Sequence, residues 1–93
     1  MPLTRVISFK ALLQKNNRVA VPKLIRWQFK MEADQLLRVG VWLPQSYEGW
    51  QHFYAKMSKD GRILIPLLIL VLIAREEKPA LAGHIFDVTL EPT

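Results

Sequence analysis

The chain has no cysteine, and its four glycines are scattered through 93 residues. The lack of cysteine excludes a disulfide framework and a metal site built on thiolates. Because the glycines form no cluster, the sequence also lacks a glycine-rich loop that could cradle a phosphate. Proteins without disulfides are typical of reducing compartments, so we predict a cytoplasmic location.

Long hydrophobic runs are missing as well. The most apolar stretch, ILIPLLILVLIA at residues 63–74, would span only about 18 Å as a helix, whereas a bilayer core is about 30 Å thick. Residues 1–13 contain no apolar segment followed by a small-residue cleavage site, so no signal peptide is expected. We therefore expect no membrane partner.

The residue types of metal and catalytic sites are few and far apart. His52 and His84 do not have the spacing of metal ligands, and each is interpreted as a packed or exposed strand residue. No serine lies in a nucleophile motif, and Glu76-Glu77 is interpreted as a solvated pair. We expect no metal and no cofactor and assign no catalytic residue, so a binding protein is favoured over an enzyme.

Positive charge is plentiful and unevenly distributed. The net charge is +5, and residues 1–46 hold eight Lys and Arg against two Asp and Glu, whereas residues 47–93 hold five against six. A basic first half favours an anionic partner, most commonly nucleic acid. Ordinary solubilising charge is the alternative.

The chain repeats itself. FKALLQKNNRVAVP at residues 9–22 and FYAKMSKDGRILIP at residues 53–66 share Phe, Ala, Lys, Arg and Pro at a constant offset of 44. Each half reads as a strand, a tight turn, a short strand ended by proline, a helix and a last strand. These elements are expected at residues 18–22 and 62–66 for the short strands, at 22–30 and 67–76 for the helices, and at 6–14, 36–43, 50–58 and 84–92 for the other strands.

The second half differs from the first in two expected ways. Its helix, LLILVLIARE at residues 67–76, has no polar face and should be buried nearly all round. The loop after that helix should be about five residues longer than its counterpart in the first half. Asp60-Gly61 predicts a two-residue hairpin turn with positive φ at Gly61, so Gly61→Val should be strongly destabilising.

Each half is too small to bury its own apolar faces, so one half should cover the other. We predict a mainly β protein with two short helices, closed as a six-stranded barrel of two ββαβ halves related by a pseudo-twofold axis. Residues 1–93 would form one domain, with half-barrels at about 5–43 and 49–92. Because each half buries the apolar face of the other, a monomer is expected.

Residues 15–39, KNNRVAVPKLIRWQFKMEADQLLRV, resemble the AbrB/SpoVT-type half-barrel of prokaryotic transcription factors. The resemblance extends over residues 9–41, and the second half keeps only its turn, short strand and proline. Leu70 replaces a basic helix residue there, and Ala33 stands where the family usually has glycine. The residues that carry the resemblance are Arg18, Val19, Val21, Pro22, Arg26 and Asp34.

In that family two chains each supply one half-barrel, whereas both halves lie in one chain here. The sequence therefore resembles fused members of the cradle-loop barrel group, especially small archaeal proteins with a RIFT-type barrel. This resemblance implies a nucleic-acid-binding protein, such as an AbrB-like transcriptional regulator that binds DNA through the basic first half. The same group implies alternatives: a small-ligand or nucleotide-binding barrel related to riboflavin kinases or translation factors, or a protein-interaction module.

Basic residues are the candidate nucleic-acid contacts. One set flanks the two turns, and the other has the three- and four-residue spacing of one helix face. The alternatives are arginines that brace the barrel or bind another anion, and a solvated helix face. The candidates are Lys15, Arg18, Lys59 and Arg62 at the turns, and Lys23, Arg26 and Lys30 on the helix.

Aromatic residues are numerous enough to provide base-stacking platforms. Packing in the core or between the halves is the simpler explanation for them. The residues concerned are Trp27, Trp42, Tyr47, Trp50, Phe53 and Tyr54.

Overall fold

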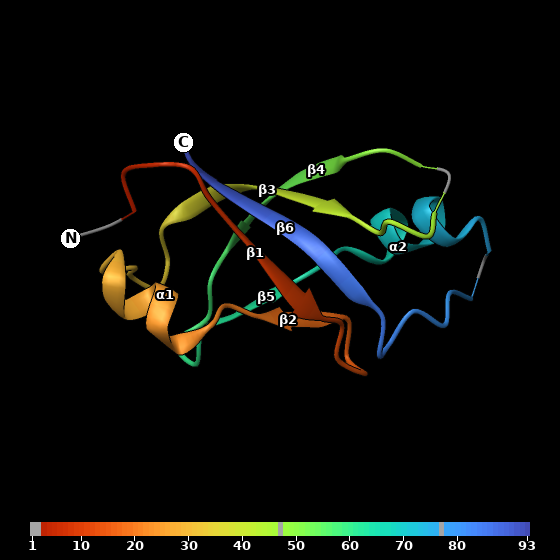
Figure 1. Cartoon of the computed structure of the whole chain (residues 1–93), viewed down its shortest axis with the longest axis horizontal. Helices are drawn as coiled ribbons and strands as arrows, with labels where there is room; N and C mark the ends of the chain where they lie inside the picture. The colour runs from red at the N-terminus through yellow and green to blue at the C-terminus, as the bar shows by residue number, and fades with distance from the viewer. Residues whose placement is uncertain (1–2, 47, 77) are drawn as a thin grey trace.

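The computed structural model describes residues 3–46, 48–76 and 78–93. The elements alternate in the order ββαβ in each half (Figure 1). They are β1 (Ile7–Leu12), β2 (Arg18–Ala20), α1 (Lys23–Gln28), β3 (Leu36–Trp42), β4 (Gln51–Lys56), β5 (Arg62–Leu64), α2 (Leu67–Ala74) and β6 (Ile85–Pro92). The predicted mainly β architecture with two short helices is confirmed.

The strands form two sheets that pack on each other. Four strands pair antiparallel in the order β1-β6-β3-β4, and β2 pairs antiparallel with β5 beneath them. Two of the four strands come from each half, and the small sheet takes one strand from each (Figure 1). The halves are therefore interleaved, and neither makes a sheet without the other.

The predicted closed six-stranded barrel is wrong in one respect, because the ladder of hydrogen bonds does not close. The described residues show no ladder between β1 and β2 or between β4 and β5. Each of these connections is joined only at its turn, where Gln14 N donates to Arg18 O and Ser58 N donates to Arg62 O, both at 2.8 Å. The short strands then leave their hairpins and pair with each other.

The turns explain this departure. Gly61 N donates to Ser58 O at 2.9 Å, and of the three loop residues between Ser58 and Arg62 only Gly61 has a positive φ, of 80°. The loop is a turn followed by a left-handed residue, not the predicted two-residue turn, which needs positive φ at both positions. A left-handed residue that follows a turn in this way forms a β-bulge, which increases the right-handed twist of the hairpin. The added twist directs β5 away from β4, and Asn17, with φ of 62°, does the same for β2.

A pseudo-twofold relation runs through the hydrogen bonds. Val21 N donates to Gly61 O at 2.8 Å, and the residues 44 positions from each, Ile65 and Asn17, form the same bond at 2.8 Å. β1, β2 and α1 recur as β4, β5 and α2, which each start 44 residues later. β6 starts 49 residues after β3, because α2 is two residues longer than α1 and the loop after α2 is three residues longer than its counterpart, where the sequence predicted about five for the loop alone. Val19 pairs with its own equivalent, Ile63, so the axis passes between them.

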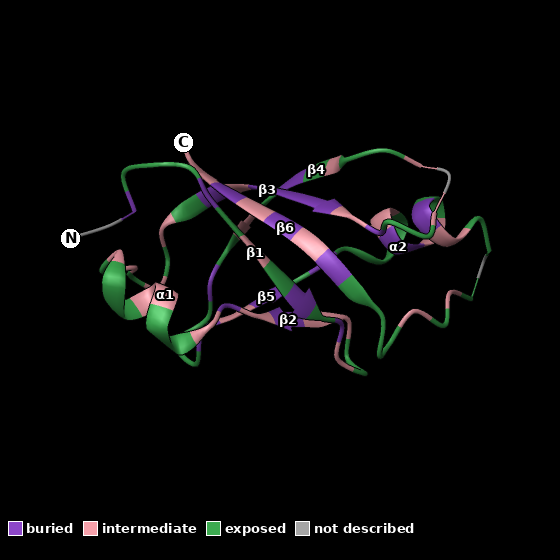
Figure 2. Ribbon diagram, in the orientation of Figure 1, coloured by how far each residue is buried: buried purple, intermediate pink, exposed green. Residues whose placement is uncertain are grey.

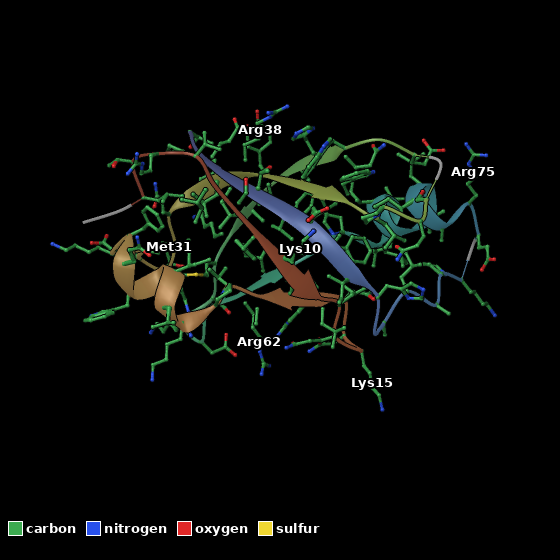
Figure 3. The ribbon with its side chains drawn as sticks, viewed as in Figure 1. Lys10, Lys15, Met31, Arg38, Arg62 and Arg75 are labelled. Carbon is green, nitrogen blue, oxygen red and sulfur yellow. The ribbon has the colours of Figure 1, made fainter. Side chains whose placement is uncertain are left out.

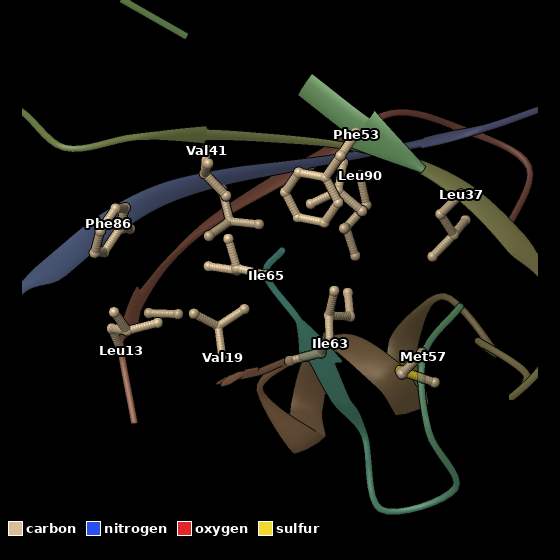
Figure 4. Close-up of a cluster of buried hydrophobic side chains, with 14 of the residues drawn as sticks. Leu13, Val19, Leu37, Val41, Phe53, Met57, Ile63, Ile65, Phe86 and Leu90 are labelled. Atoms are coloured by element: carbon tan, nitrogen blue, oxygen red, sulfur yellow. The ribbon is translucent and has the colours of Figure 1, made fainter. Parts of the chain in front are cut away.

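The core lies between the two sheets. Alternate residues of β3 and β6 point down onto Val19 and Ile63, which are fully buried (Figure 4). These core strands show the alternation of buried and accessible residues that the sequence predicts, except that Gly40 of β3 is buried as well (Figure 2). The buried set on the two central strands is Leu37, Val39, Val41, Phe86, Val88 and Leu90. Among the described residues no polar or charged side chain is buried.

Helix α2 is not buried nearly all round, contrary to the prediction. Only Leu70 and Ile73 are buried, while Leu68 is 80% exposed and Leu67 and Leu72 are also exposed. Within residues 3–46, 48–76 and 78–93, no third layer covers the outer side of the helix (Figure 2). In the part of the chain that the structure describes, no helix is long and apolar enough to cross a membrane.

The left-handed glycines give a test of the turn. Gly61→Ala should lower the free energy of unfolding more than Gly83→Ala does. Gly83 also has a positive φ, of 89°, but it has open space around it. Left-handed strain of about 1–2 kcal/mol is common to both substitutions. A Cβ at Gly61 would also lie 2.5 Å from Nε of Arg26 and displace that guanidinium, which donates to Val21 O at 3.2 Å. The extra cost should be about 0.5–1.5 kcal/mol.

Denaturant unfolding of the two variants measures the difference, and Gly49→Ala is the control because nothing lies within 4 Å of that position. In an Arg26→Ala background the difference between the two glycine positions should disappear. Equal losses at both positions in the unmodified background would contradict a stabilising contact between Arg26 and the turn.

Candidate nucleic-acid interface

The small sheet has a basic outer surface. Since side chains alternate along a strand, the residues that flank inward-facing Val19 and Ile63 point outward. Arg18 lies opposite Leu64, and Ala20 lies opposite Arg62, so the two arginines are diagonal neighbours on one face. Their Cα atoms are therefore separated by about 7–8 Å. The structure brings together two of the predicted contacts through strand pairing between the halves.

Lysines extend this surface at both ends. Lys15 lies in the loop between β1 and β2, and Lys59 lies in the equivalent loop between β4 and β5. Lys15 and Arg62 project from the same side of the molecule, away from the four-stranded sheet (Figure 3). We call the surface formed by Lys15, Arg18, Lys59 and Arg62 the basic face.

One carboxylate interrupts the basic face. Asp60 accepts a hydrogen bond from the Ser58 hydroxyl, and its Oδ2 lies 3.6 Å from Nε of Arg62. The Ser58 hydrogen bond lowers the pKa of Asp60 most, and the positive charges of Arg62 and, more weakly, Arg18 lower it further. Asp60 is thus ionised at neutral pH. It offsets one positive charge at the second-half end of the basic face.

The first-half end has no such carboxylate. Asn16 occupies the position equivalent to Asp60, so Lys15 and Arg18 are not offset by an acidic residue within their turn. Arg18 forms no salt bridge within 4.0 Å among the described residues, whereas Arg62 shares Asp60. The turn sequences alone therefore make the first-half end the more electropositive.

The prediction that Lys23, Arg26 and Lys30 share one side of helix α1 is wrong. Arg26 does not point to solvent, because its guanidinium lies against the backbone of Gly61 and its Nε donates to Val21 O at 3.2 Å. Lys30 lies beyond the helix, which is capped at Phe29, and has φ of 51°. The three residues therefore do not share one helical face. Lys23 and Lys30 are exposed, and Arg26 braces the turn.

The Arg26 contact still matters for the interface. It fixes α1 beside the loop that carries Lys59, as Figure 1 shows for the helix and the turn between β4 and β5. Sequence periodicity could not find this contact, because it joins residues 26 and 61 through the crossing of the two halves. The only sequence signal for this contact is Gly61, which lacks a Cβ and so leaves room for the guanidinium, whereas the first turn has Asn17 at the equivalent position.

The aromatic candidates fall into different environments. Phe53 is buried, as core packing predicts, and Trp42 packs with Trp50 at a ring-centroid distance of 5.8 Å. Tyr54 is exposed on β4, in the four-stranded sheet. Trp27 is 80% exposed on α1. Tyr47 lies outside the described residues.

Two shallow hollows bear on the small-ligand alternative. Residues of both halves line each hollow. One has a volume of about 230 Å³, and its Ser46 hydroxyl already donates to Ile73 O at 3.0 Å while Arg75 pairs with Glu48. The other has about 310 Å³, and Lys10 and Asp87 in its wall pair with each other. Ligand pockets usually measure about 300–1,000 Å³ and have free polar groups. The first hollow is smaller than this range, and the second, at the lower end of the range, has its two charged side chains already paired with each other.

The histidines lie apart from the basic face. His52 lies on β4 opposite Gly40, and His84 lies in the loop before β6 with Nδ1 3.2 Å from Leu81 O. Among residues 3–46, 48–76 and 78–93, no group of three or more His, Asp and Glu could hold a metal ion.

Comparison with known proteins gives a structural likeness without a family. No protein-family model and no curated protein matches the chain. The solution structure of PHS018 from Pyrococcus horikoshii is similar, with a TM-score of 0.71 and 19% sequence identity over 99% of this chain and 94% of that one. At this identity the likeness concerns the fold alone.

The environment of Asp60 gives a test of the basic face. Ser58→Ala should raise the pKa of Asp60 more than Arg62→Gln, because the hydroxyl hydrogen bond contributes more than the guanidinium charge. A lowered folded pKa means that Asp60 stabilises the fold above its ordinary pKa and that this stabilisation is lost as pH falls through the lowered value. A carbon-detected NMR titration of the side-chain carboxyl groups measures the shifts.

Lys10→Gln is the matched control, since Lys10 lies on the four-stranded sheet (Figure 3). It should leave the titration of Asp60 unchanged. A larger upward shift in Arg62→Gln than in Ser58→Ala would contradict the hydrogen-bonding arrangement described above.

Proposed function

We propose that this protein binds nucleic acid through the basic face, by neutralising backbone phosphates. The observation that supports the proposal most is the placement of Arg18 and Arg62 on the outer side of one two-stranded sheet, with Lys15 and Lys59 at its ends. Guanidinium groups suit this role, because their planar donors match phosphate oxygens. Contacts of this kind position a protein on nucleic acid without reading its sequence.

The alternative of bracing arginines is less well supported at Arg18. A bracing arginine would pair with an acidic turn, and only Arg62 has such a neighbour in Asp60. Helix α1 adds Lys23 at its first turn, next to the end of β2. The first half thus supplies more of the positive charge, as its composition suggests. We infer that Lys30, beyond the helix, contributes only through longer-range attraction.

The relationship to known families is also a proposal. We infer a fused AbrB-like chain of the cradle-loop group, in which two half-barrel repeats related to RIFT-type barrels pair inside one polypeptide. The bonds that repeat at an offset of 44, such as Val21 N to Gly61 O and Ile65 N to Asn17 O, support the internal duplication. A cytoplasmic transcriptional regulator that acts as a monomer is the function that this kinship favours.

Salt-dependent binding tests the proposal. The unmodified protein should bind a labelled DNA or RNA oligonucleotide at about 50 mM salt and weaken as salt rises, because phosphate neutralisation releases counterions. Arg18→Gln and Arg62→Gln should each lower the affinity. Each should also reduce the slope of log K against log salt by about 0.7–0.9 for every phosphate that the variant no longer neutralises. Fluorescence anisotropy measures both quantities.

Two further variants serve as controls. Lys10→Gln removes a charge from the other sheet and should leave the slope unchanged. Asp60→Asn keeps a residue that suits the turn and removes the opposing carboxylate, so it should raise the affinity. The proposal fails if neither duplex nor single-stranded oligonucleotides bind at about 50 mM salt.

A second candidate function is protein interaction, and the exposed face of α2 favours it. Leu67, Leu68 and Leu72 are exposed on a helix without a charged residue. Surface leucines gathered in this way are typical of interaction sites. Three leucines supply much less than the roughly 800 Å² that each partner buries in a standard interface. We therefore infer weak self-association through α2 in a symmetric pair, the commonest arrangement of oligomers.

Light scattering at increasing protein concentration tests this candidate. The unmodified chain should change from monomer to dimer toward millimolar concentration, and Leu68→Glu should remain a monomer, because a charge at the centre of the pair is unfavourable. Leu24→Glu, at the equivalent position of α1, is the matched control and should not alter the change. A mass that stays monomeric throughout would contradict self-association.

A further inference from the structure

Trp27 is the most unusual side chain near the basic face. It is 80% exposed, whereas an aromatic ring of this size is normally mostly buried. It lies on α1, one residue after Arg26, and Arg26 holds that helix against Gly61 of the turn that carries Lys59. The indole is therefore presented on an anchored element that adjoins the basic face.

The opposite side of α1 is what anchors the helix. Ile25 and Phe29 pack against the core, and no residue of α1 is itself buried. Lys23 lies one helical turn before Trp27, so the two residues share a face of the helix. The outward side of α1 thus combines an accessible aromatic ring with a positive charge.

The internal repeat shows that the fold does not need tryptophan at this position. Val71 occupies the equivalent position in α2, and Leu67 occupies the position of Lys23. Both helices follow a proline and start at the same place relative to their short strands. Packing demands that are common to the two halves are therefore met without an indole or an ammonium group.

We infer that Trp27 stacks on an unpaired base, so that the partner of the basic face is a single strand of nucleic acid. This inference rests on the proposed function. Exposed aromatic rings beside a positively charged track are the usual arrangement for binding single strands. In a duplex the base faces are already stacked on each other, so a ring on a protein surface has no base face to contact.

The other tryptophans do not offer the same arrangement. Trp50 is 42% exposed and packs against Trp42. It lines a hollow over β1 and β6 of the four-stranded sheet, in which Lys10 is paired with Asp87. Of the tryptophans, only Trp27 lies on the helix whose Arg26 contacts Gly61 of the loop that carries Lys59.

The test compares strand types with matched variants. Fluorescence anisotropy at about 50 mM salt would use a labelled 12-nucleotide single-stranded DNA of mixed sequence, the same sequence as RNA, and its 12-base-pair DNA duplex. At least one single strand should bind more tightly than the duplex. Trp27→Ala should weaken single-strand binding roughly 5- to 150-fold, the range for one stacked base, and leave duplex binding unchanged. Trp27→Phe should retain most of the affinity.

Leu24→Ala is the control, because Leu24 is an apolar residue of the same helix and is 74% exposed. It should leave single-strand binding unchanged, and the melting temperatures of all variants should agree. Equal affinity of Trp27→Ala and the unmodified protein for both single strands would overturn the inference and leave the proposed function intact, as would tighter binding of the duplex. The absence of binding to all three oligonucleotides would overturn both.

Discussion

The pairing of β2 with β5 is the interaction on which the rest of the molecule depends. Each strand has three residues, and neither has another ladder partner among the described residues. Their meeting places Val19 and Ile63 beneath the four-stranded sheet and so closes the core. The same alternation turns Arg18 and Arg62 outward. One strand pairing thus produces the hydrophobic contact between the halves and the positively charged surface, and a change in its register would remove both.

The duplication explains why much of the fold could be predicted from the sequence. Phe, Ala, Lys, Arg and Pro recur at one offset, and the elements recur with them, because alternation and proline are local signals that act the same way twice. The failure of the hydrogen-bond ladder to close could not be predicted in this way. It depends on the twist added by a left-handed residue in each turn, Asn17 and Gly61, and Asp60-Gly61 also fits a two-residue turn that would have kept β4 and β5 paired.

The candidate site was predictable only in part, for a related reason. The residues of the two turns share a surface because strands β2 and β5 pair, and the repeat itself indicated that equivalence. Arg26 was placed wrongly because helical spacing says nothing about a partner on another element. Its guanidinium rests on a glycine of the other half, 35 positions away in the sequence. The exposure of α2 was missed because an apolar helix predicts burial only where the chain has something to bury it with.

A duplicated chain carries its own control, because both halves satisfy the same packing geometry. Where they agree, as at Pro22 and Pro66, a shared requirement of the fold is a sufficient explanation. Where they differ at exposed positions, packing does not explain the choice. The two helices diverge in this manner: one carries exposed Lys23 and Trp27, and the other carries exposed Leu67 and half-buried Val71. The same architecture accommodates both sets of residues, so the fold does not determine which set each helix carries. We therefore attribute the difference to binding, for which the two ends of the molecule present different surfaces.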